Sequence, residues 1–271
     1  MSRIADGFAA ASATGETALV AYLTAGYPHP DETVGLVRAA VTAGADLIEL
    51  GVPFSDPMGD GPVIQESSRV ALTAGTTLDT VLRLVAEIRR EGVVVPVALM
   101  GYYNPFLRYG LKRLVEDATA AGVDGLVVPD LPAHQADELL DLAGRDGLDT
   151  VFFAAPGSRP ERVAYTASRA SGFLYCLATD GVTGMRDDLD PRLLEFLARV
   201  RAATALPLAV GFGISTPAHV RALRGHADGV IVGSALVRTM ADASGPQARR
   251  AAVAKVVADL KAATRPAAPP R

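Results

Sequence analysis

The sequence has little of several features that mark whole classes of protein. It contains one cysteine, Cys176, which excludes an internal disulfide framework and fits a reducing compartment. No run of about 18 apolar residues is present, so we expect no transmembrane helix, and the first residues lack the apolar run of a secretory signal. The net charge is −4 with scattered basic residues, which argues against nucleic-acid binding. Together these absences predict a cytoplasmic protein.

What is present is a regular alternation of short apolar runs and longer amphipathic segments. Hydrophobic residues make up 49% of the 271 residues, enough for a large core. Most of the short runs are continuously apolar, which is typical of parallel strands covered on both faces. We expect eight strands, at 18–26, 46–51, 96–102, 124–130, 149–156, 172–178, 207–213 and 228–234.

Between these runs, apolar residues recur at spacings of three and four, which predicts helices. The clearest segments are 31–44, 111–122, 133–144, 160–168 and 190–204. Three of these segments end at glycine, at Gly44, Gly122 and Gly144, as expected for helix C-terminal caps.

Eight strand-then-helix units in this length predict an α/β protein, most simply a (β/α)8 TIM barrel. A weak internal repeat supports it: AGADLIELGVP, AGVDGLVVPDLP and HADGVIVGSAL share a helix end, an Asp and an apolar strand. The alternative is a doubly wound open sheet, but no G-x-G-x-x-G turn follows the first apolar run. We expect one barrel domain over 1–264 with an extra N-terminal helix, then a disordered Pro-rich tail over 265–271.

Carboxylates gather after the second expected strand, where a barrel places its active site. Glu49 has apolar neighbours, among which an unpaired carboxylate is costly, so it is either an acid/base facing the interior or a paired surface residue. Asp60 lies between Gly59 and Gly61, which permit close approach of a ligand. Asp56, in a Ser-Asp-Pro turn, fits a turn former. The three carboxylates could bind magnesium, but no histidine lies nearby, and a metal is the less favoured interpretation.

Glycine-rich strand ends predict a phosphate site at the other end of the chain. VGFGIS (210–215) and IVGSA (231–235) close the last two expected strands. Gly211, Gly213 and Gly233 would leave backbone N–H groups open to a phosphate, and Ser234 adds a hydroxyl at a helix start. Glycines that serve only tight turns are the alternative.

The segment TDGVTGMRDDLDP (179–191) is long, polar and rich in glycine. Its composition fits a lid that closes over substrate, or an ordinary exposed loop. Before it, Phe173, Tyr175 and Leu177 alternate along the expected strand. If that face points inward, Tyr175 enters the barrel mouth, and Cys176 is a buried apolar residue rather than a nucleophile.

Taken in order, several motifs resemble those of the tryptophan synthase alpha chain family, and the resemblance runs from residue 16 to residue 262. They are AYLTAGYP, LIELGVPFSDPMGDGPVIQ, LMGYYNP, VPDLP, GVTG, GFGIS and DGVIVGSA. The resemblance implies retro-aldol cleavage of indole-3-glycerol phosphate to indole and glyceraldehyde 3-phosphate. It implies that Glu49 exchanges the protons, that Asp60 stabilises the developing positive charge, and that Tyr175 lies near the reacting side chain.

The resemblance also assigns the binding residues and the assembly. Phosphate contacts would be Gly184, Gly213, Gly233 and Ser234, and Thr183 would order the lid. The indole pocket would be formed by Tyr22, Ile64, Met100, Phe212 and Val232. No cofactor or metal is implied on this chain. The implied partner is a beta chain that carries pyridoxal phosphate, in an α2β2 heterotetramer through which indole passes to make tryptophan.

Three positions depart from the commonest family pattern, namely Gly157 and, in the expected lid, Asp180 and Met185. Glu49 and Asp60 are both kept, so we expect the departures to affect lid closure and communication with a beta chain rather than the acid/base chemistry. Three alternatives stay open: a free-standing lyase with the same chemistry, a weakly active allosteric partner of the beta chain, and a phosphosugar isomerase or epimerase. The last leaves the loop after the second expected strand unexplained.

Overall fold

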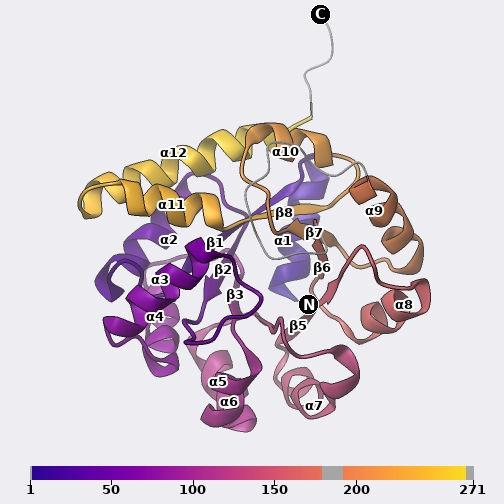
Figure 1. Cartoon of the computed structure of the whole chain (residues 1–271), viewed down its shortest axis with the longest axis horizontal. Coiled ribbons are helices and arrows are strands. Elements are labelled where there is room, and N and C mark those ends of the chain that lie inside the picture. Colours follow the sequence, from indigo (N-terminus) through magenta and orange to yellow (C-terminus); the bar gives the residue numbers. More distant parts are fainter. Residues whose placement is uncertain (1, 179–191, 267–271) are drawn as a thin grey trace, which may run out of the picture.

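The computed structural model describes residues 2–178 and 192–266. Eight parallel strands pair in chain order, and β1 closes the barrel by pairing with β8 (Figure 1). The expected (β/α)8 barrel is therefore confirmed. The strands are β1 (Ala18–Thr24), β2 (Leu47–Gly51), β3 (Val97–Met100), β4 (Gly125–Val127), β5 (Asp149–Ala154), β6 (Leu174–Leu177), β7 (Leu208–Gly211) and β8 (Gly229–Val232). Most are shorter than expected, because apolar residues continue into the loops after the backbone leaves the sheet.

Helices surround the barrel (Figure 1). They are α2 (Thr33–Thr42), α3 (Pro62–Thr73), α4 (Leu78–Arg90), α5 (Tyr103–Tyr109), α6 (Leu111–Ala121), α7 (Asp137–Asp146), α8 (Pro160–Arg169), α9 (Arg192–Ala203), α10 (Pro217–Leu223), α11 (Ser234–Asp242) and α12 (Pro246–Thr264), with 3-10 turns η1 (Pro30–Glu32) and η2 (Ala133–Gln135). None in the described ranges is both long and apolar enough to cross a membrane.

The extra N-terminal helix α1 (Arg3–Ala13) closes the N-terminal end of the barrel. Ile4 packs against Gly125 and Phe8 against Gly229, which are the first residues of β4 and β8. A Cβ on either glycine would lie within 2.8 Å of these side chains, so the helix fits because both positions are glycine. With this end plugged, the opposite end of the barrel is left for a site.

One expected helix end is wrong. Gly144 lies inside α7, which continues to Asp146, and Gly147 caps it in the left-handed conformation with φ 73°. Gly122 caps α6 as expected, with φ 88°. Either glycine near the end of α7 could act as a C-terminal cap, because glycine adopts positive φ easily. The structure places the left-handed residue at Gly147, so the helix ends there.

The internal repeat has a structural cause at the starts of the even-numbered strands. A side chain there accepts the backbone N–H of a residue near the start of the preceding strand, at 2.7–2.8 Å. The pairs are Asp46 with Leu19, Asp124 with Val97, Ser171 with Thr150, and Asp228 with Leu208. Each bond ties a strand to its neighbour, which explains why an Asp before an apolar run recurs in the sequence.

We expect Asp124→Ala to lower the free energy of unfolding by about 3–5 kcal/mol, because it removes the anion of a buried ion pair. The Asp124 carboxylate contacts Arg3 at 2.6 Å and the largely buried Arg89 at 2.5 Å, besides the Val97 N–H. Urea unfolding measures the loss. The control is Asp79→Ala, which removes an exposed carboxylate that contacts Arg113 and the Tyr109 hydroxyl and should cost far less. Equal losses in the two variants would contradict this role for Asp124.

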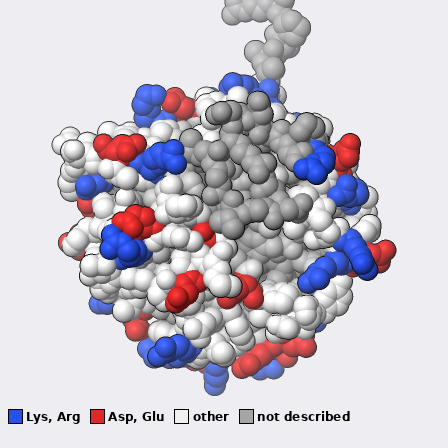
Figure 2. Space-filling model, viewed as in Figure 1, with Lys and Arg blue, Asp and Glu red and all other residues white. Residues whose placement is uncertain are grey.

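Charged side chains of both signs are mixed around the rim of the face shown in Figure 2. In this view the described residues show no continuous basic band, in keeping with the scattered Lys and Arg of the sequence.

Candidate active site

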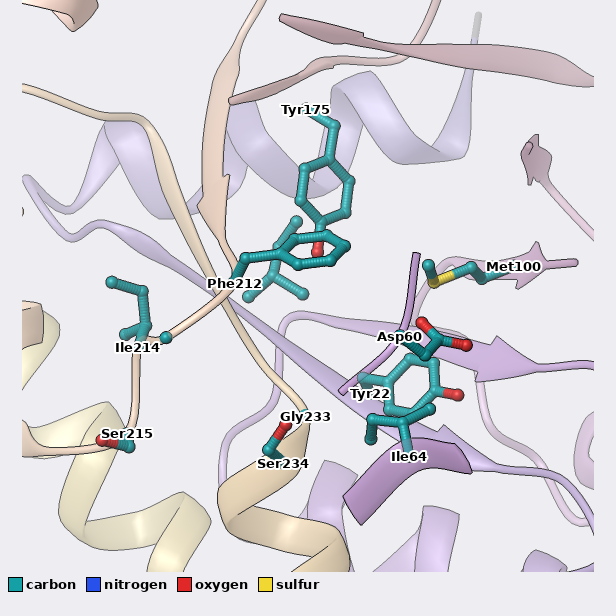
Figure 3. Close-up of a pocket in the computed structure, with 12 residues that line it drawn as sticks. Tyr22, Asp60, Ile64, Met100, Tyr175, Phe212, Ile214, Ser215, Gly233 and Ser234 are labelled. Atoms are coloured by element: carbon teal, nitrogen blue, oxygen red, sulfur yellow. The ribbon is translucent and has the colours of Figure 1, made fainter. Parts of the chain in front are cut away.

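A cavity lies at the C-terminal end of the barrel. Its walls come from strand ends and from the loops after β2, β7 and β8 (Figure 3). The lining residues are Tyr22, Asp60, Ile64, Met100, Tyr175, Phe212, Gly213, Ile214, Ser215, Ile231, Gly233 and Ser234. The cavity therefore brings together the carboxylate-bearing loop and the glycine-rich strand ends, which lie more than a hundred residues apart in the chain.

The two ends of this cavity differ chemically. Asp60 lies beside Tyr22, Met100 and Ile64, whereas Ser234 lies across from this group (Figure 3). The end near Asp60 therefore combines apolar side chains with a carboxylate that can accept a hydrogen bond.

Two tyrosines form the inner wall because the neighbouring strands carry glycine beside them. A Cβ on Gly51 would lie 2.2 Å from the Tyr22 hydroxyl, and a Cβ on Gly211 would lie 2.2 Å from the Tyr175 hydroxyl. The Tyr175 ring also meets Phe212 edge-on, with centroids 5.6 Å apart. Gly211 thus makes room for Tyr175, and the structure does not place it in the cavity lining with Gly213.

Glu49 is completely buried in the middle of β2. Among the residues that the structure describes, neither of its carboxylate oxygens has a hydrogen-bond partner. Burial, and then the charge of Asp60, raise the Glu49 pKa to about 8. Glu49 acts electrostatically on Tyr22 and Tyr175, so it belongs to the same wall. At neutral pH the Glu49 carboxyl group is protonated, and its proton makes no hydrogen bond to a described protein group. A proton that is free to be donated suits a general acid.

Asp60 is 8% exposed, and burial raises its pKa to about 6. The Tyr102 hydroxyl opposes this shift, because its hydrogen bond to the Asp60 carboxyl group favours the ionised form. Near pH 7 the site therefore contains one protonated carboxyl group, on Glu49, and one ionised carboxylate, on Asp60. Two carboxyl groups whose pKa values are driven apart can divide acid and electrostatic roles between them.

The loop that carries Asp60 is held by residues to which the sequence assigned no role. The Tyr102 hydroxyl accepts the Gly59 N–H at 2.9 Å, and Gln65 on α3 donates to the Asp60 carbonyl oxygen at 2.9 Å. Both residues stand inside the family motifs LMGYYNP and GDGPVIQ. The motifs therefore point to both residues. Their function in holding the loop depends on the shape of that loop, which the sequence does not show.

The opposite end of the cavity presents backbone N–H groups. Phe212 has φ 67°, an uncommon conformation for a residue other than glycine, and Gly213 follows with φ 105°. Such strain persists where the surrounding structure imposes it, commonly at ligand sites. Ser234 is the first residue of α11, where N–H groups lack partners within the helix and the dipole favours an anion. This end of the cavity is suited to a phosphate.

Comparison with known proteins shows to which family the chain belongs. The family model described as Tryptophan synthase alpha chain matches residues 8–265. The chain belongs to the tryptophan synthase alpha chain family. Members of this family are lyases that act on indole-3-glycerol phosphate, and the family works with a beta chain.

Individual relatives support the assignment. The chain is 52% identical to the tryptophan synthase alpha chain of Roseiflexus castenholzii, over 89% of this chain and 92% of the relative. It is 44% identical to that of Chloroflexus aggregans, over 97% and 98%. A solved structure of Mycobacterium tuberculosis tryptophan synthase matches with a TM-score of 0.90 and 38% identity, covering 98% of this chain and 99% of that chain.

One residue assigned to the indole pocket from the family resemblance lies outside the cavity lining. Val232 does not line the cavity, and Ile231 does. Gly229 and Gly233 face Phe8 and Tyr22 on the inner side of β8. Because side chains alternate along a strand, Ile231 shares their inward face and Val232 points toward the surrounding helices.

The remaining assigned residues fall into three groups. Glu49 is completely buried and is not among the residues that line the cavity. Those that line the cavity are Tyr22, Asp60, Ile64, Met100, Tyr175, Phe212, Gly213, Gly233 and Ser234. The expected lid, with Asp180, Thr183, Gly184 and Met185, lies outside the described residues. So do residues 267–271 of the expected tail.

Two other side chains with possible chemistry lie apart from this cavity. Asp56 is exposed on the loop after β2, and the Ser55 hydroxyl donates to it at 2.5 Å, as suits a turn former. Burial raises the pKa of the Cys176 thiol to about 12, which makes it unreactive. Within residues 2–178 and 192–266, no group of three or more His, Cys, Asp or Glu side chains could hold a metal ion.

Proposed function

We propose that this chain is the alpha subunit of tryptophan synthase and cleaves indole-3-glycerol phosphate to indole and glyceraldehyde 3-phosphate. The observation that carries the proposal is the arrangement of Glu49 and Asp60. Glu49 is a buried acid without a described hydrogen-bond partner, and it interacts electrostatically with Asp60, whose ionised carboxylate lines a cavity with a far end that suits a phosphate.

The reaction needs proton transfer and charge stabilisation. The Glu49 carboxyl group donates its proton to the indole ring carbon that bears the side chain, and the positive charge that develops is shared by the ring nitrogen. The ionised Asp60 carboxylate accepts a hydrogen bond from the ring N–H and stabilises that charge. Glu49 then takes the proton of the side-chain hydroxyl as the carbon–carbon bond breaks and the aldehyde forms. The proton balance closes, and Glu49 ends protonated as it began.

The other walls orient the substrate. Aromatic and apolar side chains, among them Phe212, Ile64 and Met100, pack against a flat indole ring. The N–H groups near Gly213 and Ser234 bind the phosphate and so fix the reacting carbon between the two carboxyl groups. The assigned contact from Gly184 and the lid role of Thr183 belong to this proposal.

The proposal includes the assembly and the setting. This acid/base chemistry needs no cofactor or metal on this chain, and we expect pyridoxal phosphate on the beta chain. We propose an α2β2 heterotetramer, in which indole passes to the beta chain for tryptophan synthesis. The single cysteine supports a cytoplasmic location.

The deciding experiment measures indole release from indole-3-glycerol phosphate by the purified chain, with and without a cognate beta chain. We expect slow release by the chain alone and a large increase with the beta chain. Fast release that the beta chain leaves unchanged would instead favour a free-standing lyase. Release in neither condition would overturn the lyase proposal, and turnover of a sugar phosphate without an indole group would indicate an isomerase.

The two carboxyl groups predict a bell-shaped pH profile for kcat/KM. Asp60 must be ionised, so activity should rise with pH through its pKa of about 6. Glu49 must be protonated, so activity should fall above its pKa of about 8. Asp60→Asn should lower activity and flatten the acid limb, and the alkaline limb should move to lower pH, because the Asp60 charge that helps to raise the Glu49 pKa is removed. An acid limb that survives in Asp60→Asn would belong to another group.

A further inference from the structure

A chain of buried hydroxyl groups lies behind the apolar end of the cavity. The Ser67 hydroxyl, on α3, donates to the Ile64 carbonyl oxygen at 2.8 Å. The Thr24 hydroxyl, at the end of β1, lies 2.7 Å from the Ser67 hydroxyl and 3.4 Å from the Tyr22 hydroxyl. Tyr22 and Ile64 line the cavity beside Asp60 (Figure 3), whereas Thr24 and Ser67 are not among the lining residues. The chain therefore joins two walls of the cavity from behind.

The direction of each proton in this chain follows from its last acceptor. A carbonyl oxygen can only accept, so the single Ser67 proton points to Ile64. The Ser67 oxygen then accepts the Thr24 proton, at a normal length for two hydroxyl groups. With that proton used, Thr24 can only accept at its contact with Tyr22. The chain thus draws the Tyr22 proton toward Thr24.

Tyr22 needs an anchor because it lies over a glycine at each end. A Cβ on Gly51, in β2, would lie 2.2 Å from the Tyr22 hydroxyl, and a Cβ on Gly233, after β8, would lie 3.1 Å from its Cδ1 atom. The two glycines make room for the ring but place no side chain beside it. The hydroxyl end of the ring is therefore held by Thr24 and not by side chains at these two positions.

Burial makes each link of the chain costly to lose. Thr24 and Ser67 are each 1% exposed, so bulk water does not replace a missing hydroxyl. A neighbour left without its partner carries the cost of an unsatisfied buried group. The charge that acts most strongly on Tyr22 is that of Asp60. A phenol proton released from Thr24 would be attracted to the Asp60 carboxylate, which the proposed reaction needs for the indole N–H.

We propose that Thr24 and Ser67 are positioning residues of the indole pocket, which anchor the Tyr22 ring as a wall and keep its hydroxyl proton directed away from Asp60. The inference rests on the proposed function, because the ligand ring that meets this wall is taken to be indole. Each residue acts through Tyr22. If the two hydroxyls only fastened β1 to α3, their loss would lower stability and leave ligand binding unchanged.

The test measures the Kd of the purified chain for indole, the proposed product, by calorimetry, together with KM and kcat for indole-3-glycerol phosphate. Thr24→Val removes the hydroxyl at nearly constant shape, Ser67→Ala breaks the next link, and Thr24→Ser keeps the hydroxyl. The matched control is Thr264→Val, which also removes a buried hydroxyl, because Thr264 donates to the Lys261 carbonyl oxygen at 2.8 Å. Thr264 lies at the opposite end of the barrel, where its carbonyl oxygen accepts the N–H of Thr17, just before β1.

We expect Thr24→Val to raise the indole Kd and the KM about 3- to 10-fold with little change in kcat, because a wall binds the ground state and the transition state alike. Ser67→Ala should act in the same direction but less strongly, because Tyr22 keeps Thr24 as its neighbour. Thr24→Ser and Thr264→Val should bind indole like the wild type. In a Tyr22→Phe background, Thr24→Val should add much less, since no hydroxyl remains to be anchored.

A measurement without ligand separates this inference from the proposed function. NMR of protein labelled at tyrosine Cζ reports the exchange of each hydroxyl proton with solvent, and Tyr22→Phe assigns the Tyr22 signal. In Thr24→Val the Tyr22 proton should exchange faster, while that of Tyr175, on the other inner wall, should not change.

An unchanged indole Kd in Thr24→Val would overturn the inference, as would an equal loss in the wild-type and Tyr22→Phe backgrounds or an unchanged exchange of the Tyr22 proton. Should Thr24→Val fail to fold, Ser67→Ala in the same two backgrounds decides. If the wild-type chain neither binds nor releases indole, the proposed function fails, and the exchange measurement still decides whether Thr24 holds the Tyr22 hydroxyl.

Discussion

Glu49→Gln is expected to lower kcat for indole release by about 10²–10⁴-fold, while KM stays close to the wild-type value. Glutamine has nearly the same shape but cannot donate a proton to the ring carbon or take one from the hydroxyl. Asp60, which lines the cavity, cannot replace Glu49 as the acid near neutral pH, because its pKa is about 6. Single-turnover assays, with substrate binding measured separately, distinguish lost chemistry from lost binding. Turnover near the wild-type rate would remove Glu49 from the acid/base role.

The same variant should be more stable than the wild type, which separates lost chemistry from misfolding. The Glu49 pKa is about 8 in the folded chain against an ordinary value of 4.5. The folded state therefore binds this proton more tightly, and the stability linked to it is present at low pH and lost as the pH rises through about 8. Glutamine stays neutral throughout. The advantage of Glu49→Gln in the free energy of unfolding should grow between pH 5 and 9, reaching the order of a few kcal/mol.

The fold could be predicted because its signal is repeated along the chain. Each parallel strand is buried on both faces and reads as a continuous apolar run, so eight such runs with helices between them indicate a barrel. Strand ends could not be placed as well. Tyr102 lies two residues after the end of β3 and is buried like a strand residue.

For the site, the chemistry of a residue was easier to predict than the direction in which its side chain points. Glu49 stood out because a carboxylate among apolar residues needs a reason. Val232 and Ile231 are equally apolar, and in a strand with two buried faces the sequence does not show which residue points inward. Contacts from Phe8 and Tyr22 to the glycines of β8 resolve the direction. The bond from Tyr102 to Gly59 joins two loops and depends on strand register, which no local pattern reveals.

The second large effect is expected at the other end of the cavity. Ser234→Asp should raise KM for indole-3-glycerol phosphate by about 100-fold or more. Two like charges about 4 Å apart near a protein surface repel by about 4 kcal/mol before screening by salt. Ser234 lines the cavity and begins α11, so its carboxylate variant would occupy the place proposed for the phosphate. The fold should survive, because aspartate in the first turn of a helix favours the helix dipole.

Two further measurements make the effect specific to charge. Ser234→Ala loses only a hydroxyl and should raise KM by about tenfold or less, since the backbone N–H groups remain. Inorganic phosphate should inhibit the wild type in competition with substrate and should lose this effect in Ser234→Asp. High salt should weaken the penalty in the aspartate variant more than in the alanine variant, because only the former acts through charge. A wild-type KM in Ser234→Asp would place the phosphate elsewhere, and the orientation that sets the indole ring between Glu49 and Asp60 would then have to be reversed or abandoned.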